Sequence, residues 1–591
     1  MKKVSSLKLP LRLSSPLQTG LLSAAALLTS ASGAVAQTFD TAPLPGPTLA
    51  GAVHGADALA TLGDRLGDIA LSHDMEEDAL AELLQHEPTL WVTENDQLLY
   101  VDIPASATPR NESAGYNGTI PLSSAFFLHT NPGADKVIFL DFDGHQSKNN
   151  GWGHNITFPA FNESGSASSF TNGELQSIIN HWEYIAEDFA AYDVDVTTEE
   201  PDQDHLRKST IGDKTWGVRA LFTQYTSGFG NGSGGVALLG TFTDFQDTPC
   251  FIFNKGDNNG SMSGSHEVGH TLGLFHDGLN GSSYHPGSGS GATGWGPIMG
   301  APFGKTVVQW SNGDYSGSTT TQDDIGFITS FGNGIKVKAD DHGDVVGAGT
   351  PLVIACPGTS FAPEAGVIHT RSDVDAFSFS TSGGSATISA TPWSPGPNCD
   401  IRLELYDAGG ILIGSHDPNN ATNATISQTL SAGSYTVLID GVDKPNLYSD
   451  YGSQGQYTLT VTATPSGAFV SIGTGLAGGT GVPLATGSGL PCVGNTVSVD
   501  LSGALPNANA WLALGIGQLN APFKGGVLIP DITFGGAFLP SPTDGSGTTS
   551  LPSTWPVGVT PGVPLDFQFW IQDPAGVAGF AATNGLEMIT P

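Results

Sequence analysis

Residues 266–277 read HEVGHTLGLFHD, and this stretch decides how the sequence around it is interpreted. Two histidines four positions apart lie on one face of a helix, so His266 and His270 can offer ring nitrogens to one zinc ion. Glu267 stands beside the first of them. It could reach a water at the metal without occupying a coordination position, as a general base does.

The second half of the stretch supplies a turn and a third ligand. Gly273 can adopt a backbone conformation that ends the helix, so that His276 returns toward the metal. Three protein ligands leave a fourth position open, which is typical of a catalytic zinc site rather than a structural one. A lone HExxH motif often arises by chance, but two ligands, a base, a glycine and a third ligand in register predict a zinc peptidase.

The complete pattern HExxHxxGxxH resembles the metzincin metallopeptidases. Asp277, which follows it, resembles the reprolysin-like (adamalysin) branch, and residues 296–300 (GPIMG) with Met299 resemble the methionine turn that this family has beneath its metal. Ala301 follows where several other branches carry a tyrosine. The resemblance covers about residues 135–331 and implies an α+β catalytic domain that hydrolyses proteins or peptides.

The resemblance also implies a strand above the helix that binds substrate by backbone pairing, because an extended peptide can add a strand to an exposed sheet edge. The candidate strand begins with Gly235, Val236, Ala237 and Leu238. An ordinary interior strand is the alternative interpretation of these residues.

The first 36 residues have the pattern of an export signal. Four basic residues and no acid accompany an apolar run at residues 20–29, and small residues precede a cleavage position after Ala36. A retained membrane anchor is the alternative. No later segment approaches the roughly 20 apolar residues that a spanning helix needs, so the sequence predicts a secreted protein without membrane insertion.

The charge balance argues against nucleic acid as a partner. The chain has 20 Lys and Arg against 56 Asp and Glu, a formal net charge of −36, whereas phosphate binding needs concentrated basic residues. The acidity suits solubility, and some acids are candidate calcium ligands, with a solvated turn as the alternative. These candidates are the pairs Asp141/Asp143, Asp193/Asp195 and Asp373/Asp375.

Residues 37–130 are expected to form a propeptide, with an independent small domain as the alternative. A helical patch near residues 75–85 and a strand at 97–103 are its clearest elements. No cysteine precedes Cys250, so a thiol cannot keep the metal site latent. A carboxylate, a backbone carbonyl or steric occupation of the cleft would have to block the open position.

Residues 131–335 are expected to form the metzincin-like catalytic domain. Thr171 and Glu174 have the spacing of a capping box, and the apolar spacing after them predicts an amphipathic helix. The predicted strands of this region lie at residues 136–142, 194–198, 216–223, 235–242 and 250–254.

Short alternating strands separated by Gly, Pro, Asn and Asp turns replace helical periodicity after residue 336. They are predicted at residues 375–380, 385–391, 400–407, 425–430, 434–440 and 456–463. Residues 336–464 resemble the pre-peptidase C-terminal (PPC) domain, which implies a β-sandwich without catalytic residues. Residues 465–591 form a second all-β unit whose role the sequence does not indicate. Among the four cysteines, Cys356 and Cys399 are the favoured pair because both fall in one predicted domain.

Together these features predict a multidomain chain with an α+β metzincin-like domain followed by two all-β, β-sandwich-like domains. The predicted function is a secreted zinc endopeptidase made as a zymogen. A cell-surface adhesion protein with a catalytically silent metzincin-like domain is the alternative. Glu267 argues against it, because a structural metal site needs the ligands but not the base. The sequence does not indicate an oligomeric state.

Overall fold

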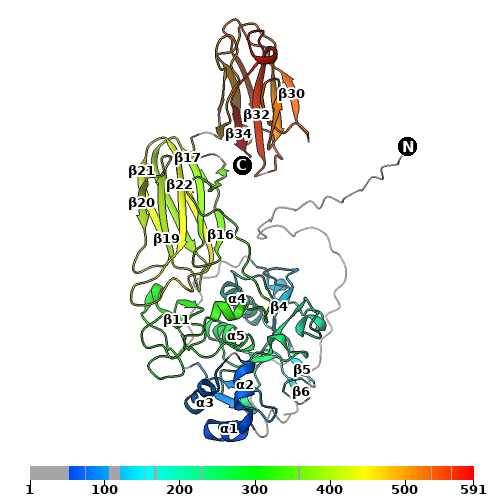
Figure 1. Ribbon diagram of the computed structural model, residues 1–591, viewed down its shortest axis with the longest axis vertical. Coiled ribbons are helices and arrows are strands. Elements are labelled where there is room, and N and C mark those ends of the chain that lie inside the picture. The colour runs from blue at the N-terminus through cyan, green and yellow to red at the C-terminus, as the bar shows by residue number, and fades with distance from the viewer. Residues whose placement is uncertain are drawn as a thin grey trace, which may run out of the picture. The chain divides into compact units, whose positions relative to one another are not determined.

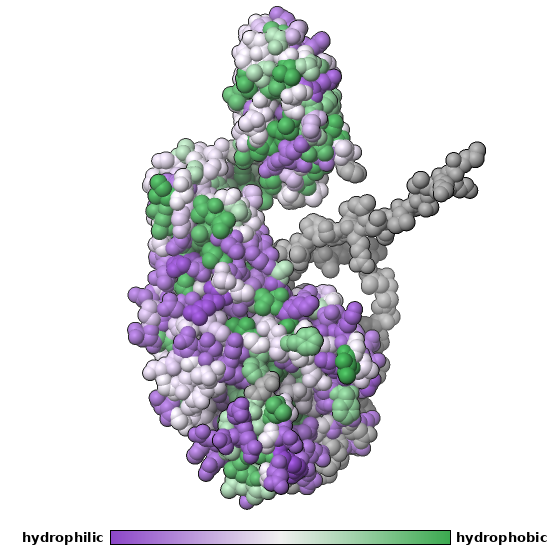
Figure 2. Space-filling model, viewed as in Figure 1, coloured by the Kyte–Doolittle hydropathy of each residue, from purple (hydrophilic) through white to green (hydrophobic). Residues whose placement is uncertain are grey.

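The computed structural model describes residues 52–105 and 120–590, apart from residues 74, 149, 153–154, 166–168, 226–227, 231, 357, 359, 467, 534 and 561. The expected export signal, its cleavage site and part of the expected propeptide lie outside the described residues. Within them the chain is mostly β, with several sheets and few helices (Figure 1). No helix among the described residues is long and apolar enough to cross a membrane. Hydrophilic side chains are widespread on the face that Figure 2 shows, among smaller apolar areas.

An eight-stranded sheet organises the first half of the chain, in the order β1-β2-β3-β9-β10-β8-β4-β7. β4, β7, β8 and β10 run parallel, β9 is antiparallel to β10, and β3 is antiparallel to β9. The sheet thus crosses the domain boundary expected at residue 130. Its strands are β1 (Val53–His54), β2 (Leu90–Val92), β3 (Leu98–Val101), β4 (Lys136–Asp141), β7 (Asp195–Thr197), β8 (Trp216–Phe222), β9 (Gly235–Leu238) and β10 (Cys250–Ile252).

Helix α4 (Asn172–Asp188) begins at the predicted capping box. The Thr171 side chain accepts a hydrogen bond from the Glu174 backbone N–H, and the Glu174 carboxylate accepts one from the Thr171 N–H at 2.8 Å. This part of the sequence interpretation is confirmed.

Helix α5 (Asp257–Thr271) carries the first two histidines and packs against α4 and strands β8, β9 and β10. It contains several glycines because neighbouring elements approach it closely. A Cβ at Gly264 would lie 2.8 Å from Ile185 and 2.9 Å from Phe222. Small residues on α5 therefore allow the helix to lie deep in the core, where nearly all of its residues are buried.

Residues 52–105, called the N-terminal segment below, contain three short helices besides strands β1, β2 and β3. The helices are α1 (Gly55–Leu62), α2 (Leu66–Ser72) and α3 (Glu77–His86), and they pack around an apolar cluster of their own. Leu239 and Phe275, from the region after residue 131, complete this cluster. Residues 120–130, in contrast, belong to the main core, in which Ala125 and Leu128 are buried. The core that surrounds α4 and α5 therefore starts before the boundary expected at residue 131.

Two sheets with an apolar core between them make up the region after residue 350. The six predicted strands are present, and three of the strands given below, β13, β16 and β20, are additional to them. One sheet contains β13 (Thr350–Pro351), β17 (Val374–Thr381), β22 (Gly433–Gly441), β19 (Ile401–Asp407) and β20 (Leu412–His416), and the other contains β16 (Glu364–Ile368), β23 (Gly455–Thr462), β18 (Gly384–Pro392) and β21 (Ala424–Leu430).

Buried polar contacts join α4 to this β-sandwich. The Glu187 carboxylate accepts hydrogen bonds from the Gln456 backbone N–H at 3.1 Å and from the Gln456 side-chain amide at 2.9 Å. Asp188 accepts one from the Asn398 side-chain amide at 2.8 Å.

From the sequence alone, a chain that ends near residue 335 is expected to keep its activity, because every residue assigned to the chemistry lies before that point. Such a chain would leave these buried acids without their partners, so we expect it to be less stable.

The last region has its own apolar core between a six-stranded and a three-stranded sheet. A disulfide joins Cys356 to Cys492, so the expected Cys356–Cys399 pairing is wrong. Cys399 is instead buried in the sandwich core. The main strands here are β24 (Phe469–Ile472), β34 (Gly585–Ile589), β32 (Pro564–Gln572), β27 (Ala510–Ile516), β30 (Ala537–Pro540) and β33 (Phe580–Ala582), with β25 (Leu484–Ser488), β26 (Thr496–Ser502) and β31 (Thr549–Thr554).

The remaining elements are short. They comprise helix α6 (Asp324–Ile328) and the strands β5 (His145–Ser147), β6 (Ile156–Phe158), β11 (Trp295–Pro297), β12 (Val307–Gln309), β14 (Ile354–Ala355), β15 (Ser360–Phe361), β28 (Gln518–Phe523) and β29 (Gly526–Pro530).

Candidate metal centre

The three predicted histidine ligands lie together and are buried. Helix α5 places His266 and His270 one turn apart, and their ring centroids are 4.7 Å apart. Gly273 has φ 98° just after the helix, and the chain turns so that the His276 ring lies 5.2 Å from that of His266 and 4.9 Å from that of His270. A left-handed residue at this position favours glycine, which explains the local sequence.

Hydrogen bonds on the far side of two rings fix which nitrogen faces the centre. Nδ1 of His266 is 2.8 Å from the Ile298 carbonyl oxygen, and Nδ1 of His270 is 2.7 Å from that of Leu274. A carbonyl can only accept, so each Nδ1 carries the proton and each Nε2 keeps a free lone pair. His266 Nε2 is buried and has no hydrogen-bond partner among the described residues. This donor set fits a zinc ion.

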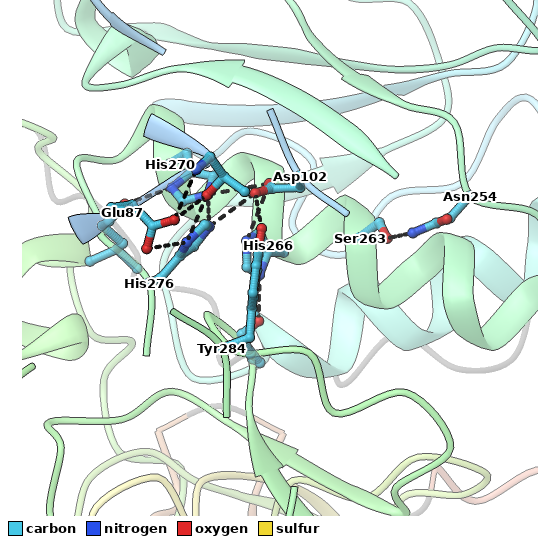
Figure 3. A network of polar contacts seen from close by, with 11 residues as sticks. Glu87, Asp102, Asn254, Ser263, His266, His270, His276 and Tyr284 are labelled. Carbon is cyan, nitrogen blue, oxygen red and sulfur yellow. Dashed lines mark hydrogen bonds and ion pairs between the residues drawn. The ribbon is translucent and has the colours of Figure 1, made fainter. Parts of the chain in front are cut away.

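A fourth donor, Asp102, comes from the end of β3 (Figure 3). Its Oδ1 is 3.0 Å from Nε2 of His276, and its Oδ2 is 3.4 Å from Nε2 of both His266 and His270. One donor atom from each of the four residues lies within 4.8 Å of the others. The carboxylate therefore lies where the three-histidine set would leave its open position.

Sequence reasoning anticipated a carboxylate as one of three possible blocking groups but did not identify Asp102. Its distance from His266 along the chain is more than 160 residues, and no local motif marks it. The one available signal is that it lies within the strand predicted at residues 97–103, one position after the observed β3.

The backbone around Asp102 pairs with the strand expected to bind substrate. Tyr100 is opposite Ala237 and Val101 is opposite Val236. The Asp102 N–H donates to the Gly235 carbonyl at 3.0 Å. Strand β9 therefore lies between β3 and β10 and is not the exposed edge that the resemblance implies, because residues 98–102 provide the hydrogen bonds that an edge would leave open.

Charge within the site is balanced by the histidines. Burial opposes ionisation of Asp102, yet the charges of His276 and His266 hold the pKa of Asp102 well below its usual value. Burial would lower the pKa of His276, but the Asp102 carboxylate raises it to about 9. Burial lowers the pKa of His270 to about 4. Asp102 and His276 thus each favour the charged form of the other.

Glu267 is buried next to the histidines but is not one of the four clustered donors. Its Oε2 has no hydrogen-bond partner among the described residues. Burial, and then the nearby charge of Asp102, raise the pKa of Glu267 well above its usual value. A Cβ at Gly235 would collide with Oε1 of Glu267. Glycine at this position of β9 therefore leaves the space that the carboxylate occupies.

The turn at residues 296–300 lies against the histidine helix. Met299 is fully buried, and a Cβ at Gly269 would lie 2.5 Å from its sulfur atom. The Asp277 N–H donates to the Met299 carbonyl at 2.8 Å. Burial raises the pKa of Asp277 to about 7. This turn is thus packed against the helix that carries His266 and His270.

Three further residues contact the site and were not found from sequence. The Tyr284 hydroxyl donates to Asp102 Oδ1 at 2.7 Å, and its ring centroid is 4.3 Å from that of His276. Tyr100 stacks on His270 at 4.1 Å between centroids. Glu87 Oε2 lies 3.5 Å from Nδ1 of His276. These residues are remote from the motif in sequence or lie in the loop after it, so spacing gives no sign of them.

A cavity of about 420 Å³ lies beside the centre. Its lining is largely apolar and includes Ile103, Leu279 and Phe303, together with Tyr284. Tyr284 and Ile103 also line the smaller pocket that contains His266 and Glu267. The largely apolar cavity therefore adjoins the pocket at the histidine centre.

No family model and no curated protein matches the chain. Among solved structures, the pre-peptidase C-terminal domain of collagenase from Bacillus anthracis matches at 12% identity and a TM-score of 0.16, covering 20% of this chain and 99% of that one. PliG of Aeromonas hydrophila, a periplasmic inhibitor of g-type lysozyme, matches at 17% identity and a TM-score of 0.15, covering 19% of this chain and 93% of that one. Likenesses at these scores support no statement about function.

Proposed function

We propose that the chain is a zinc-dependent endopeptidase whose N-terminal segment holds it in a latent form. The observation that carries this proposal is the convergence of the three histidine Nε2 atoms beside Glu267, a buried carboxylate outside the ligand set. His266, His270 and His276 would hold the zinc. Export from the cell, which residues 1–36 suggest, is part of the same proposal.

The role proposed for each residue at the centre depends on whether it would be a ligand of the metal. A bound zinc ion would polarise the scissile carbonyl and activate water. Glu267 would accept the proton of the attacking water and return it to the leaving amine. Gly235 gives Glu267 room, and the Ile298 and Leu274 carbonyls orient the imidazoles.

Strand β9 would bind the substrate once β3 has left it. The departure of residues 98–102 would expose the hydrogen-bonding groups of Gly235, Ala237 and their neighbours, to which an extended peptide can pair. The adjacent apolar cavity would then receive a side chain next to the scissile bond. Proteins and peptides are therefore the substrates we expect.

Latency would have two components in this arrangement. The Asp102 carboxylate lies beside the three histidines, where it would fill the open ligand position of a bound ion. Strand β3 pairs with β9, where it would take the place of an extended substrate. Both block the site without a thiol, in agreement with the absence of cysteine before Cys250.

The proposal is tested by incubating a denatured protein with the chain after its N-terminal segment has been cleaved and removed. We expect hydrolysis that a chelator abolishes and added zinc restores. A zinc-loaded, folded chain without residues 52–105 that cleaves nothing would refute the peptidase and favour the adhesion protein with a silent site.

Gly235→Ala should lower kcat/KM by about tenfold or more while zinc content stays unchanged. The added Cβ collides with Oε1 of Glu267 and must displace the base, and misplacing a catalytic group by about 1 Å can cost about 10²-fold. Gly173→Ala is the matched control, because Gly173 is exposed on α4 and a Cβ there would meet no atom closer than 3.8 Å. Equal kcat/KM in Gly235→Ala and the parent would show that the close approach does not matter.

Tyr284→Phe should lower kcat by about tenfold with little change in KM. In the latent form its hydroxyl donates to the oxygen of Asp102 that faces His276. After Asp102 leaves, the same donor would face oxygen atoms of the reacting substrate, where donors stabilise developing charge. Steady-state kinetics of the activated variant, with Tyr315→Phe as control, measure this. An unchanged kcat would limit Tyr284 to a role in latency.

A further inference from the structure

A second group of potential metal ligands lies at the start of the β-sandwich. Asp340 and Asp341 belong to the connector before it, and His369, Asp373 and Asp375 lie at or just before β17. Donor atoms of Asp340, His369 and Asp373 lie within 4.8 Å of one another, and so do those of Asp340, Asp341 and Asp375. The two sets share Asp340, so their donors form one continuous cluster.

Two of these carboxylates are buried and incompletely satisfied. Asp375 is fully buried; its Oδ2 accepts a hydrogen bond from the Tyr457 hydroxyl at 2.5 Å, whereas its Oδ1 has no partner among the described residues. Asp373 is 6% exposed; its Oδ2 accepts from the His369 N–H at 2.6 Å, and its Oδ1 has no partner among the described residues either. Buried oxygens of this kind normally have a partner, and here each lies in a cluster of acids.

The protein supplies little positive charge to this cluster. Lys338 interacts electrostatically with Asp341, but its ammonium donates to the Ala190 carbonyl at 2.8 Å. Arg371 pairs with Asp450 at 2.5 Å instead. The imidazoles of His369 and His342 lie close to Asp341, and that of His369 also lies close to Asp373. A bare, ionised cluster is therefore electrostatically unfavourable.

We propose that this cluster binds one calcium ion through carboxylate oxygens of Asp340, Asp341, Asp373 and Asp375. Ca²⁺ takes six to eight oxygen ligands in flexible geometry, so four carboxylates and added water suit it. Zinc favours nitrogen and sulfur ligands in a tetrahedral arrangement, and the cluster offers a single imidazole. The site is separate from the histidine centre and does not depend on its proposed activity.

The ion would tie the connector to the sandwich. Residues just before the cluster are anchored to the main core, where the Asp193 N–H donates to the Lys336 carbonyl at 2.7 Å and the Lys338 N–H donates to that of Ala191 at 2.9 Å. On the other side, the Ala376 N–H donates to the Gly343 carbonyl at 2.8 Å. Calcium bound both by acids of the connector and by acids at β17 would thus stabilise the connection between the main core and the β-sandwich.

The test is to titrate CaCl₂ into the zinc-loaded full chain, following heat release and the melting temperature. We expect about one calcium per chain and a rise in melting temperature, because an ion that binds only the folded state stabilises it. Asp340→Asn and Asp375→Asn should each weaken binding by about tenfold or more, since each removes a charged ligand. Glu404→Gln, the same charge change on β19, should bind calcium like the parent.

Asp340 is exposed, and one of its side-chain oxygens accepts a hydrogen bond from the His342 N–H. Asparagine also has a side-chain oxygen that can accept this bond, so Asp340→Asn should fold. Asp375→Asn likewise keeps an acceptor for Tyr457. Absence of calcium binding by the folded parent would overturn the proposal. Equal calcium affinity in both variants and the parent, or binding of zinc but not calcium at these residues, would also overturn it. None of these results bears on hydrolysis at the histidine centre.

Discussion

Glu267→Gln in the activated chain should retain zinc and fold but hydrolyse peptides about 10²- to 10⁴-fold more slowly, because proton transfer by a positioned base typically contributes that much. Glutamine has nearly the shape of glutamate, so it should fit the space beside Gly235 without disturbing the three histidines. The measurements are kcat on a short peptide and zinc content per chain.

Glu183→Gln is the matched control, because Glu183 is a partly buried acid on α4 outside the site. It should leave both kcat and zinc content unchanged. A zinc-loaded Glu267→Gln chain with the rate of the parent would show that Glu267 is not the base.

Asp102→Asn should give the uncut precursor measurable activity. Breaking a buried charge pair typically costs about 2–5 kcal/mol, and at about 1.4 kcal/mol per factor of ten this is roughly 30-fold or more in the population of open sites. Strand β3 would still pair with β9, so the variant should remain less active than a chain from which residues 52–105 have been removed. Peptide hydrolysis by uncut parent and variant measures the difference.

Glu94→Gln, an exposed acid of the same segment, should leave the precursor inactive. The sequence suggests an accessible connection at about residues 107–130, and cleavage there, before the buried Ala125, should raise activity, whereas a mercurial should not. Full activity of the uncut parent would contradict the latent form and make the N-terminal segment an ordinary domain.

Features encoded within one short stretch could be predicted from sequence. The histidine motif places its ligands by helical geometry and one glycine turn, and the capping box at Thr171 marks the start of α4 by local hydrogen bonds. Alternation of apolar residues similarly located β17 and β22, because each has one face in the sandwich core.

Features that depend on distant parts of the chain could not be predicted. Asp102 and Glu87 meet the histidines only after the sheet has brought β2 and β3 beside β9. Tyr284 reaches them from the loop after the motif, which has no pattern that marks it. The Cys356–Cys492 disulfide joins regions that the sequence separates by 136 residues. Strand β20 was missed because its residues are mostly exposed and lack alternation.

The central claim is that three histidines hold a catalytic zinc ion. Its most direct test is elemental analysis of the purified, folded chain and of the variant with His266, His270 and His276 replaced by alanine, with His205→Ala as control. We predict about one zinc per chain in the parent and control and almost none in the triple variant. Undiminished zinc in a folded triple variant would contradict the account.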